Sequence, residues 1–469
     1  MRIGWSQVDA VFERLRALEL ATRPVHPETE AALGRRWDEL PDHVKHEGQC
    51  LGRRTAGCEG THGVFPRCDL ACTPCYHSRD ANRVRIDGEH TLAEIDRQMA
   101  YLRQQRGPGQ YVQLIGGEVT LLDPDDHAEA LLVMRRHGRK PMSMSHGDFD
   151  YAYLERMAVG PDGSPRFSQL SFAGHFDSMM FGRRGARRVE DERELNPHRR
   201  AFCEMFQRLE REHGVKHYLA HNMTVTPRNL GQVAQVIRDC RDMGFRMFSF
   251  QPAAFIGNPN RWKDDYEEVT SERVWAEVER GAGGHLPWNA FQIGDERCNR
   301  TAYGVYVGDR YVQLVDDRDP HDLEVRDAFL EAFGGMDFEA PHLAPKLARV
   351  FARHPRGIPI LLRWVRRFVR RAGLVPLLRH GARPVTFVMH SFMDARDVRP
   401  AWELLQRGEM SDDPRVRATQ ERLQSCSYAM AHPESDMLVP ACAQHSVLDP
   451  QENLELMELL PIAEEPATR

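Results

Sequence analysis

Three cysteines lie within eight residues of one another, in the stretch CDLACTPC (68–75) of a 469-residue chain that has ten cysteines in all. We call this stretch the cysteine loop. Cys68, Cys72 and Cys75 follow the spacing Cx3Cx2C. Thiolates are ligands that iron–sulfur clusters and zinc both favour. Three thiolates on one loop can bind three irons of a [4Fe–4S] cluster, which leaves the fourth iron open to another ligand.

A structural zinc site is the alternative interpretation of the cysteine loop, with His62 or His77 as a fourth ligand. Zinc sites usually pair one CxxC with a second pair downstream. The spacing Cx3Cx2C does not follow that pattern, and no matching pair comes after Cys75. The spacing therefore favours an iron–sulfur cluster over zinc.

A second motif, LIGGEVTLL, begins about forty residues after the cysteine loop and places Gly116, Gly117 and Glu118 at the end of an expected strand. Glycines let the backbone approach a ligand closely, and a carboxylate suits an ammonium group. Strand-to-helix turns often contain two glycines, so the GGE motif alone is a weak signal. It indicates a cofactor site only in combination with the cysteine loop before it.

Together, the cysteine loop, the aromatic Tyr76 after it and the GGE motif resemble the signature of radical S-adenosylmethionine (SAM) enzymes. The resemblance implies that Cys68, Cys72 and Cys75 bind a [4Fe–4S] cluster and that the GGE motif contacts the methionine amino group of SAM. In that family one electron cleaves SAM into methionine and a 5′-deoxyadenosyl radical, which abstracts hydrogen from carbon. The cofactor carries this chemistry and the protein orients it.

Helix and strand patterns alternate between residues 91 and 254, which implies a parallel sheet with right-handed crossovers. Five or six such units suit a partial β/α barrel, with the site at the carboxyl ends of the strands. We expect an α/β fold: a partial (β/α)6 TIM-like radical SAM barrel with a helical N-terminal segment and a cysteine-bearing C-terminal extension. The expected helices are 91–105, 127–138, 198–214 and 230–244, and the expected strands are 111–118, 141–147, 167–177, 217–226 and 245–254.

Polar residues at the ends of the later expected strands are candidate contacts for SAM or for substrate. Each could instead cap a helix or satisfy a loop. These candidates are Ser145, His175, Asp177, Thr224 and Gln251.

Three cysteines after the expected barrel, Cys298, Cys426 and Cys442, lie in polar, turn-like stretches. We expect them to meet as a site for an auxiliary iron–sulfur cluster. Cys50 and Cys58 flank a glycine-rich loop before the cysteine loop. They could complete that second site, bind zinc with His62, or do neither.

Composition divides the chain into four expected segments. Residues 1–59 are helical and contain two cysteines, residues 60–310 form the barrel, residues 311–395 are basic and amphipathic, and residues 396–469 are acidic with the last two cysteines. Between residues 341 and 390 there is no Asp or Glu. The basic residues there are Lys346, Arg349, Arg353, Arg356, Arg363, Arg366, Arg367, Arg370, Arg371, Arg379 and Arg383.

The stretch GIPILLRWVRRFVRRAGLVPLL predicts a helix that starts near Pro359 and stops at Gly373. Leu361, Trp364, Val365 and Phe368 share one expected face, with arginines on the other side. Such a helix is typical of one that lies in a membrane interface. A solvated basic face packed on the barrel, or an RNA contact, is the alternative.

The net charge of −6 argues against a globally basic nucleic-acid binder, so we expect no DNA partner. The charged N-terminus has no apolar core of a signal peptide, and no apolar run is long enough to span a bilayer. We expect a cytoplasmic protein that associates with the cytoplasmic face of a membrane.

Later motifs resemble the tetraether lipid synthase group. They are SFAGHFDS, FSFQPAAFIG, RCNRTAYGVYVGDRYVQLVDDRDP, TFVMHSFMDA with His390 and Asp394, QSCSYAM and VPAC. The resemblance implies carbon–carbon coupling of lipid alkyl chains, with two SAM-derived radicals and the sulfur of an auxiliary cluster. It also implies an electron donor such as flavodoxin or ferredoxin. Cys50 and Cys58 have no second pair, and this departs from the group's metal complement.

Two other interpretations remain. One is radical SAM modification of a peptide or small molecule, similar to the molybdenum-cofactor enzymes that share the barrel. The other is a zinc-stabilised protein that binds RNA or a membrane and is not an enzyme; it leaves the GGE motif unexplained.

Overall fold

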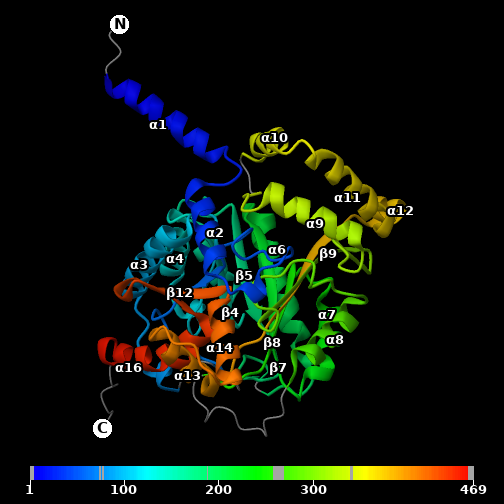
Figure 1. Ribbon diagram of the computed structural model, residues 1–469. Coiled ribbons are helices and arrows are strands. Elements are labelled where there is room, and N and C mark those ends of the chain that lie inside the picture. Colours follow the sequence, from blue (N-terminus) through cyan, green and yellow to red (C-terminus); the bar gives the residue numbers. More distant parts are fainter. Residues whose placement is uncertain are drawn as a thin grey trace, which may run out of the picture.

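A single eleven-stranded sheet organises the computed structural model, which describes residues 5–72, 75, 79–186, 188–256, 269–338 and 342–462 (Figure 1). The predictions for Tyr76 and His77 lie outside the described residues. The strands of the sheet are β1 (Cys58–Gly60), β3 (Tyr111–Leu114), β4 (Lys140–Ser145), β5 (Gln169–His175), β7 (Lys216–Val225), β8 (Met247–Pro252), β9 (Asn299–Val307), β10 (Arg310–Gln313), β11 (Arg383–His390), β12 (Tyr428–His432) and β13 (Met437–Pro440).

Eight neighbouring strands of this sheet run parallel, in the order β12-β1-β3-β4-β5-β7-β8-β11. The prediction of an α/β fold with a parallel, curled sheet is therefore confirmed. The parallel row is longer than the six strands expected, because β11 and β12 from the C-terminal part of the chain join its two ends. Antiparallel strands continue the sheet beyond each of them: β9 and β10 beside β11, and β13 beside β12.

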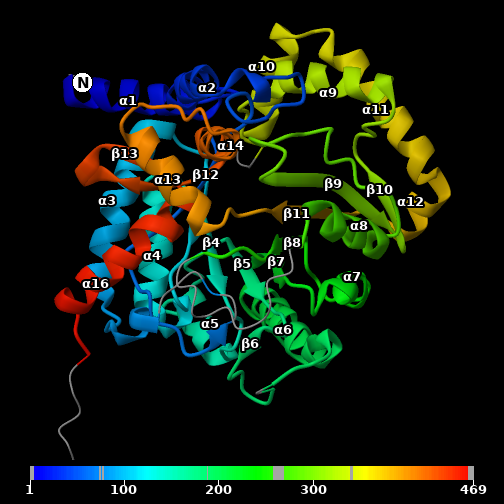
Figure 2. The same ribbon diagram turned by 60° about the horizontal axis from the view of Figure 1, so that its bottom comes forward.

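The helices between the parallel strands lie along the outer face of the sheet (Figure 2). They are α3 (Gly88–Arg106), α4 (Pro124–Arg136), α5 (Tyr151–Ala158), α6 (Asn196–His213), α7 (Val233–Cys240) and α8 (Ser271–Ala282). Asp87, Asp123 and Asp150 cap the first three by accepting a hydrogen bond from a backbone N–H of the first turn. The helices that the sequence predicts are thus present.

Alternation along the strands separates the core from the inner face. In β8, Phe248 and Phe250 are buried against the outer helices, whereas Met247, Ser249 and Gln251 face inward. The helical cysteines Cys203 and Cys240 lie fully buried in the same core, where they pack as small hydrophobic residues.

Helices outside the parallel row belong to the two ends of the chain and to the basic segment. At the N-terminus, α1 (Trp5–Ala21) extends away from the rest of the chain before α2 (Pro27–Glu39) (Figure 1). The basic segment contains α9 (Pro320–Phe333), α10 (Leu343–Arg353), α11 (Gly357–Ala372) and α12 (Leu374–His380). The C-terminal part contains α13 (Ala395–Gln406), α14 (Pro414–Gln424), α15 (Ala441–Ala443), a π-helical turn (Gln444–Leu448) and α16 (Asp449–Leu459).

The helix α11 begins and ends where proline and glycine predict, and Gly373 closes it with a φ of 81°. Its faces differ from the prediction. Trp364 and Phe368 turn inward, and the Trp364 indole donates a hydrogen bond to the Leu314 carbonyl at 2.8 Å. Arg367 and Arg371 also turn inward, to carboxylates of α9 and the turn before it. Half of the expected apolar face therefore packs on the protein.

Among the described helices, none combines the length with the apolar composition that a bilayer crossing requires. The division of the chain at residues 59, 310 and 395 stays a prediction. β11 and β12 come from the third and fourth of those segments, and they share one sheet with the expected barrel.

Candidate functional site

A cavity of about 1940 Å³ lies against the inner face of the curled sheet. The strands line it with alternate residues, such as Ser171, Ala173 and His175 of β5. Both groups of candidate metal ligands line it as well. The residues predicted from the sequence that line this cavity are Cys50, Cys58, Cys68, Cys72, Cys75, Gly116, Gly117, Glu118, Ser145, His175, Thr224, Gln251, Cys298, Cys426 and Cys442.

The GGE motif fixes the backbone that leads into the cysteine loop. The Gly117 N–H donates to the Phe65 carbonyl at 2.7 Å, and the Glu118 N–H donates to the Arg67 carbonyl at 2.9 Å. A Cβ atom on Gly116 would lie 2.3 Å from the Phe65 ring, and one on Gly117 would lie 2.0 Å from the Arg67 carbonyl oxygen. The glycines therefore let this backbone approach the end of β3, directly before Cys68.

Two further contacts hold the cysteine loop. Cys72 lies in β2 (Ala71–Cys72), which pairs antiparallel with β6 (Met180–Phe181). Asp69 accepts a hydrogen bond from His146 Nε2 at 2.7 Å, and this imidazole holds the pKa of the Asp69 carboxyl below its usual range. Burial raises the pKa of the Cys68 thiol to about 12. The loop is thus anchored to β4 and β6.

The spacing of the three thiols bears on the choice of metal. At this loop the described side chains with three ligand atoms within 4.8 Å of one another are Cys68, Asp69 and His146, and not the three cysteines. A tetrahedral zinc with Zn–S bonds of about 2.3 Å needs sulfurs roughly 3.8 Å apart. Asp69 and His146 already hydrogen-bond each other. The three thiols, as described, are therefore not arranged around a single tetrahedral zinc.

Glu118 and Ser145 meet in one buried hydrogen-bond network. Glu118 is 1% exposed. One of its carboxylate oxygens accepts from the Ser145 hydroxyl at 2.7 Å and from Thr120, and the other accepts from the His146 N–H at 2.8 Å. The carboxylate is thereby fixed at the carboxyl ends of β3 and β4, beside the cysteine loop.

His175, Asp177 and Thr224 also come together, although the last is 47 residues from the second. His175 Nε2 lies 2.6 Å from the Asp177 carboxylate and 3.3 Å from the Thr224 hydroxyl. Burial acts to raise the pKa of the Asp177 carboxyl, but His175 and the N–H groups of Thr224 and Met179 hold it below its usual range. His175 keeps a partly exposed ring at the cavity wall.

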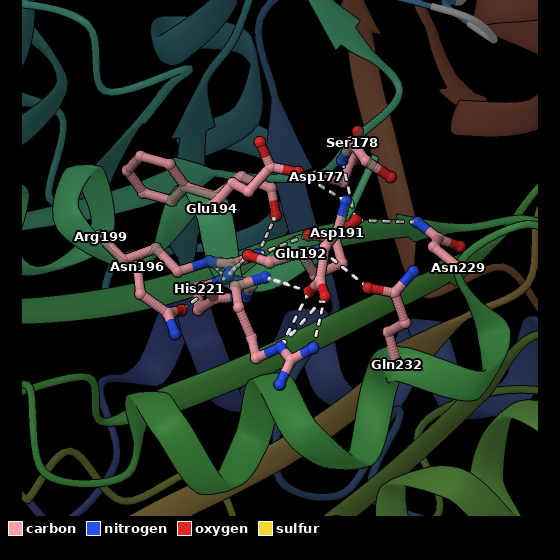
Figure 3. Close-up of polar contacts among 12 residues, drawn as sticks. Asp177, Ser178, Asp191, Glu192, Glu194, Asn196, Arg199, His221, Asn229 and Gln232 are labelled. Atoms are coloured by element: carbon pink, nitrogen blue, oxygen red, sulfur yellow. Dashed lines mark hydrogen bonds and ion pairs between the residues drawn. The ribbon is translucent and has the colours of Figure 1, made fainter. Parts of the chain in front are cut away.

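A buried ion pair between Arg199 and Glu192 holds the backbone on both sides of Asp177 (Figure 3). Arg199 donates to the Glu192 carboxylate at 2.6 Å, and both side chains are almost fully buried. Glu192 accepts from the Ser178 N–H at 2.8 Å, next to Asp177, while Arg199 donates to the Phe176 carbonyl at 3.1 Å. The pair therefore holds residues 176–178, and with them the carboxylate that orients His175.

Gln251 supplies an acceptor without a partner. Its amide nitrogen donates to the Ser249 hydroxyl at 2.9 Å, whereas its buried Oε1 has no hydrogen-bond partner among the described residues. An unsatisfied buried acceptor is costly. Because Gln251 lines the cavity, a ligand with an N–H or O–H donor would satisfy it.

Cys298, Cys426 and Cys442, which we call the auxiliary cysteine group, line the same cavity as Arg422. Arg422 Nε donates to Cys298 Sγ at 3.1 Å. Burial raises the pKa of the Cys298 thiol to about 11; the guanidinium opposes that rise and Cys426 adds to it. Burial, then Cys426 and Cys298, raise the pKa of Cys442 as well. The groups of three described ligands whose atoms lie within 4.8 Å of one another do not include these cysteines, so their shared metal site stays a prediction.

Cys50 and Cys58 are held by backbone groups. The Cys50 thiol donates to the Gly48 carbonyl at 3.7 Å, and the Cys58 thiol lies 4.0 Å from the Glu59 carbonyl. Burial raises the pKa of both thiols to about 12. Their role in metal binding stays a prediction.

The sequence did not single out His146 or Arg422. His146 follows Ser145 directly in the stretch SMSHG, so a search of strand ends for titratable residues would have found it. Arg422 lies 124 residues from the thiol that it contacts, and no local pattern marks it. His390 lines the cavity too, and burial lowers the pKa of its imidazole to about 4.

Neither a protein-family model nor a curated protein sequence matches the chain. Among solved structures it is similar to native anSMEcpe with bound AdoMet, at 14% identity and a TM-score of 0.32, over 47% of this chain and 57% of that chain. A structure of native anSMEcpe with bound AdoMet and Cp18Cys peptide matches at 13% identity and a TM-score of 0.32, over 47% of this chain and 56% of that chain. The chain thus spans a little over half the length of these proteins, and a likeness this weak does not define its family.

Proposed function

We propose that this protein is a radical SAM enzyme that abstracts hydrogen from an unactivated carbon. The observation that carries the proposal is the convergence of the cysteine loop, the GGE motif and the auxiliary cysteine group on one cavity. A stretch of three cysteines alone would suit several metal sites. Three cysteines beside a fixed carboxylate, with an unsatisfied acceptor at Gln251, suit a cluster that shares its cavity with a polar cofactor.

The residues of the chain fit these cofactors. Cys68, Cys72 and Cys75 would hold a [4Fe–4S] cluster, and bound together with SAM it would supply a 5′-deoxyadenosyl radical. His175, oriented by Asp177, and the Gln251 Oε1 would bind hydroxyl or amino groups of SAM. The cavity walls would exclude water from the reacting atoms.

The proposed substrate is a long alkyl chain. The cavity that the cysteine loop and the auxiliary cysteine group line is also lined by a set of apolar side chains from α9, α11 and the segment between them, which we call the apolar end. Phe329, Phe333, Phe338, Leu361 and Trp364 line this end. A methyl or methylene carbon has no acidic proton, so acid–base catalysis cannot activate it, whereas hydrogen abstraction can.

Carbon–carbon coupling is the proposed outcome, because the auxiliary cysteine group would place a second metal centre in the cavity that holds the alkyl chain. Modification of a peptide is the second candidate, since the cavity also contains polar side chains such as Asn222 and Ser249. The two candidates differ in substrate dependence: a peptide-modifying enzyme would turn over only with a peptide and would not require lipid.

The first experiment measures iron and acid-labile sulfide per chain after anaerobic purification. Wild type is compared with the variant Cys68→Ala/Cys72→Ala/Cys75→Ala, and Cys203→Ala is the control because Cys203 lies in the core away from the cavity. We expect about eight irons in wild type and the control, and about four in the triple variant, because each cluster holds four irons. A purified protein that binds zinc and takes up no iron on reconstitution would disprove the radical mechanism.

A further inference from the structure

An arginine-rich turn lies directly beside the strand that carries Cys72. The chain reads GRRGARR at residues 182–188, immediately after β6. β6 pairs with β2 in the register Cys72↔Met180 and Ala71↔Phe181. Paired strands lie about 4.8 Å apart. The turn is therefore the neighbour of the cysteine loop, although more than a hundred residues separate them in sequence.

A buried arginine makes this turn rigid. Arg183 is 1% exposed, and its Nη2 donates to the His146 carbonyl at 2.8 Å and to the His175 carbonyl at 3.2 Å. Its guanidinium also lies 4.9 Å from the centre of the Phe176 ring. The turn is thus fastened to the carboxyl ends of β4 and β5, the same strand ends that hold the candidate SAM contacts.

The outer side of the turn carries positive charge. Arg184 and Arg188 are exposed, and so is Arg67, which precedes Cys68. Arg188 and Arg67 form no ion pair among the described residues. Arg184 Nε lies 3.6 Å from the Asp148 carboxylate and Nη2 donates to the Asp148 carbonyl at 3.1 Å, but the Arg184 side chain remains 73% exposed. Asp69, the exposed acid nearest to Cys68 in sequence, is paired with His146. Exposed positive charge thus lies on both chain segments next to the β2–β6 pair, just before Cys68 and just after β6, in a chain with net charge −6.

We propose that Arg67, Arg184 and Arg188 form the docking surface for an acidic one-electron donor protein that reduces the cluster of the cysteine loop. The inference rests on the proposed function. In this step the donor loses one electron and the cluster gains it, with no bond made or broken. Charge complementarity brings the acidic partner to this face, and the β2–β6 pairing keeps the electron's path to Cys72 short.

This surface is separate from the basic helix α11. In Figure 2, β6 lies on the lower side of the molecule, whereas α11 and α12 lie at the upper right. An anionic membrane or RNA on α11 would leave the arginine turn accessible. The two basic regions can therefore be tested independently with matched variants.

The experiment uses the full-length, reconstituted protein and a reduced flavodoxin as the donor, without oxygen. The test variant is Arg184→Glu/Arg188→Glu, its conservative partner is Arg184→Lys/Arg188→Lys, and the control is Arg366→Glu/Arg370→Glu on α11. Three quantities are measured: the rate of cluster reduction by flavodoxin at several salt concentrations, the Kd for flavodoxin, and the rate of SAM cleavage driven by dithionite.

We expect charge reversal on the turn to slow flavodoxin-driven reduction at least tenfold at low salt, to weaken binding and to flatten the salt dependence. The lysine variant and the α11 control should stay near wild type, and dithionite-driven cleavage should be unchanged in all variants. Equal flavodoxin rates and affinities in the reversal variant and wild type would overturn the docking surface. Loss of anionic-vesicle binding in the turn variant, with flavodoxin rates intact, would do so too and assign this face to a membrane. A wild-type protein that cleaves no SAM even with dithionite would refute the proposed function instead.

Discussion

Arg422 favours the thiolate form of Cys298, whereas burial disfavours it. Burial disfavours a thiolate and raises the pKa of Cys298. The guanidinium donates to Cys298 Sγ at 3.1 Å and to the Ser391 carbonyl at 3.0 Å, so it is fixed in place. Metal binding requires the deprotonated thiol. A cation at this distance therefore favours the form of Cys298 that binds metal.

The Arg422→Gln substitution should slow alkylation of Cys298 in the metal-free protein about tenfold at pH 9. Since burial already raises the pKa of Cys298, loss of the opposing cation raises it further, and about 1.4 kcal/mol of lost stabilisation lowers the thiolate fraction about tenfold. Mass spectrometry of iodoacetamide-treated protein over time measures this rate.

Arg36→Gln is the matched control for that substitution, because Arg36 donates to the Cys426 carbonyl at 2.9 Å rather than to a thiol. Arg422→Lys keeps the charge and should fall between Arg422→Gln and wild type. Equal rates for Cys298 in wild type and Arg422→Gln would show that the guanidinium does not control this thiol.

At the scale of elements, the short turn after β3 decides where the cysteine loop lies. Gly116 and Gly117 have no room for a Cβ atom, because the backbone before Cys68 packs against them. The sequence predicted these glycines as a close approach of backbone to a ligand. In the structure they approach the Phe65 ring and the Arg67 carbonyl of the chain itself.

Gly117→Ala should therefore release the cysteine loop and cost the protein about four of its expected eight irons, while the auxiliary cysteine group keeps its own. Gly34→Ala in α2 is the control, because no atom lies within 4 Å of its added Cβ. This control should keep all iron and gain about 0.5–1 kcal/mol of stability, since alanine is the better helix residue. Iron analysis and thermal unfolding check both. Full iron in Gly117→Ala would contradict the role of the turn.

Sequence patterns predicted α3, α4, α6, α7 and the parallel strands from β3 to β8, because hydrophobic periodicity is local, but they missed the short α5 and β6. They also missed β11 and β12 as members of the parallel row, because these strands pair with partners far away in sequence. The sequence also placed Arg367 and Arg371 on the solvent face of α11, because their partners lie outside that helix. Asp319 and Asp322 draw Arg367 and Arg371 inward, and nothing within α11 itself marks those partners.

On the scale of the whole molecule, two regions that expose apolar side chains also contribute residues to the cavity wall. α1 exposes Val11, Phe12, Leu15 and Leu18. α11 and α12 expose Ile358, Leu361, Leu362, Val365, Leu374, Val375 and Leu378. Residues of both regions, Leu20 of α1 and Leu361 of α11, line the cavity. Under the proposed function, an alkyl chain would pass from a bilayer into the cavity between these two regions.

Positively charged residues of α10, α11 and α12 would favour an orientation with these helices facing an anionic membrane. Five exposed arginines of α10, α11, α12 and the turn before α11 form no ion pair among the described residues: Arg353, Arg356, Arg366, Arg370 and Arg379. Each basic residue near an anionic bilayer contributes about 1 kcal/mol. The protein is then expected to bind vesicles that contain anionic lipid and to bind neutral vesicles weakly.

Arg366→Glu/Arg370→Glu should lower partitioning onto anionic vesicles about thirtyfold or more, because two attractive charges worth about 2 kcal/mol are lost. Leu362→Asp/Val365→Asp should lower it on anionic and neutral vesicles alike, because it removes the apolar contact. Arg184→Glu/Arg188→Glu lies on the other side of the molecule and should bind as wild type does. Vesicle co-sedimentation measures all three. If the α11 variants sediment with anionic vesicles as wild type does but lose RNA binding, the basic helix serves a nucleic acid, and the alkyl chain must reach the cavity by another route.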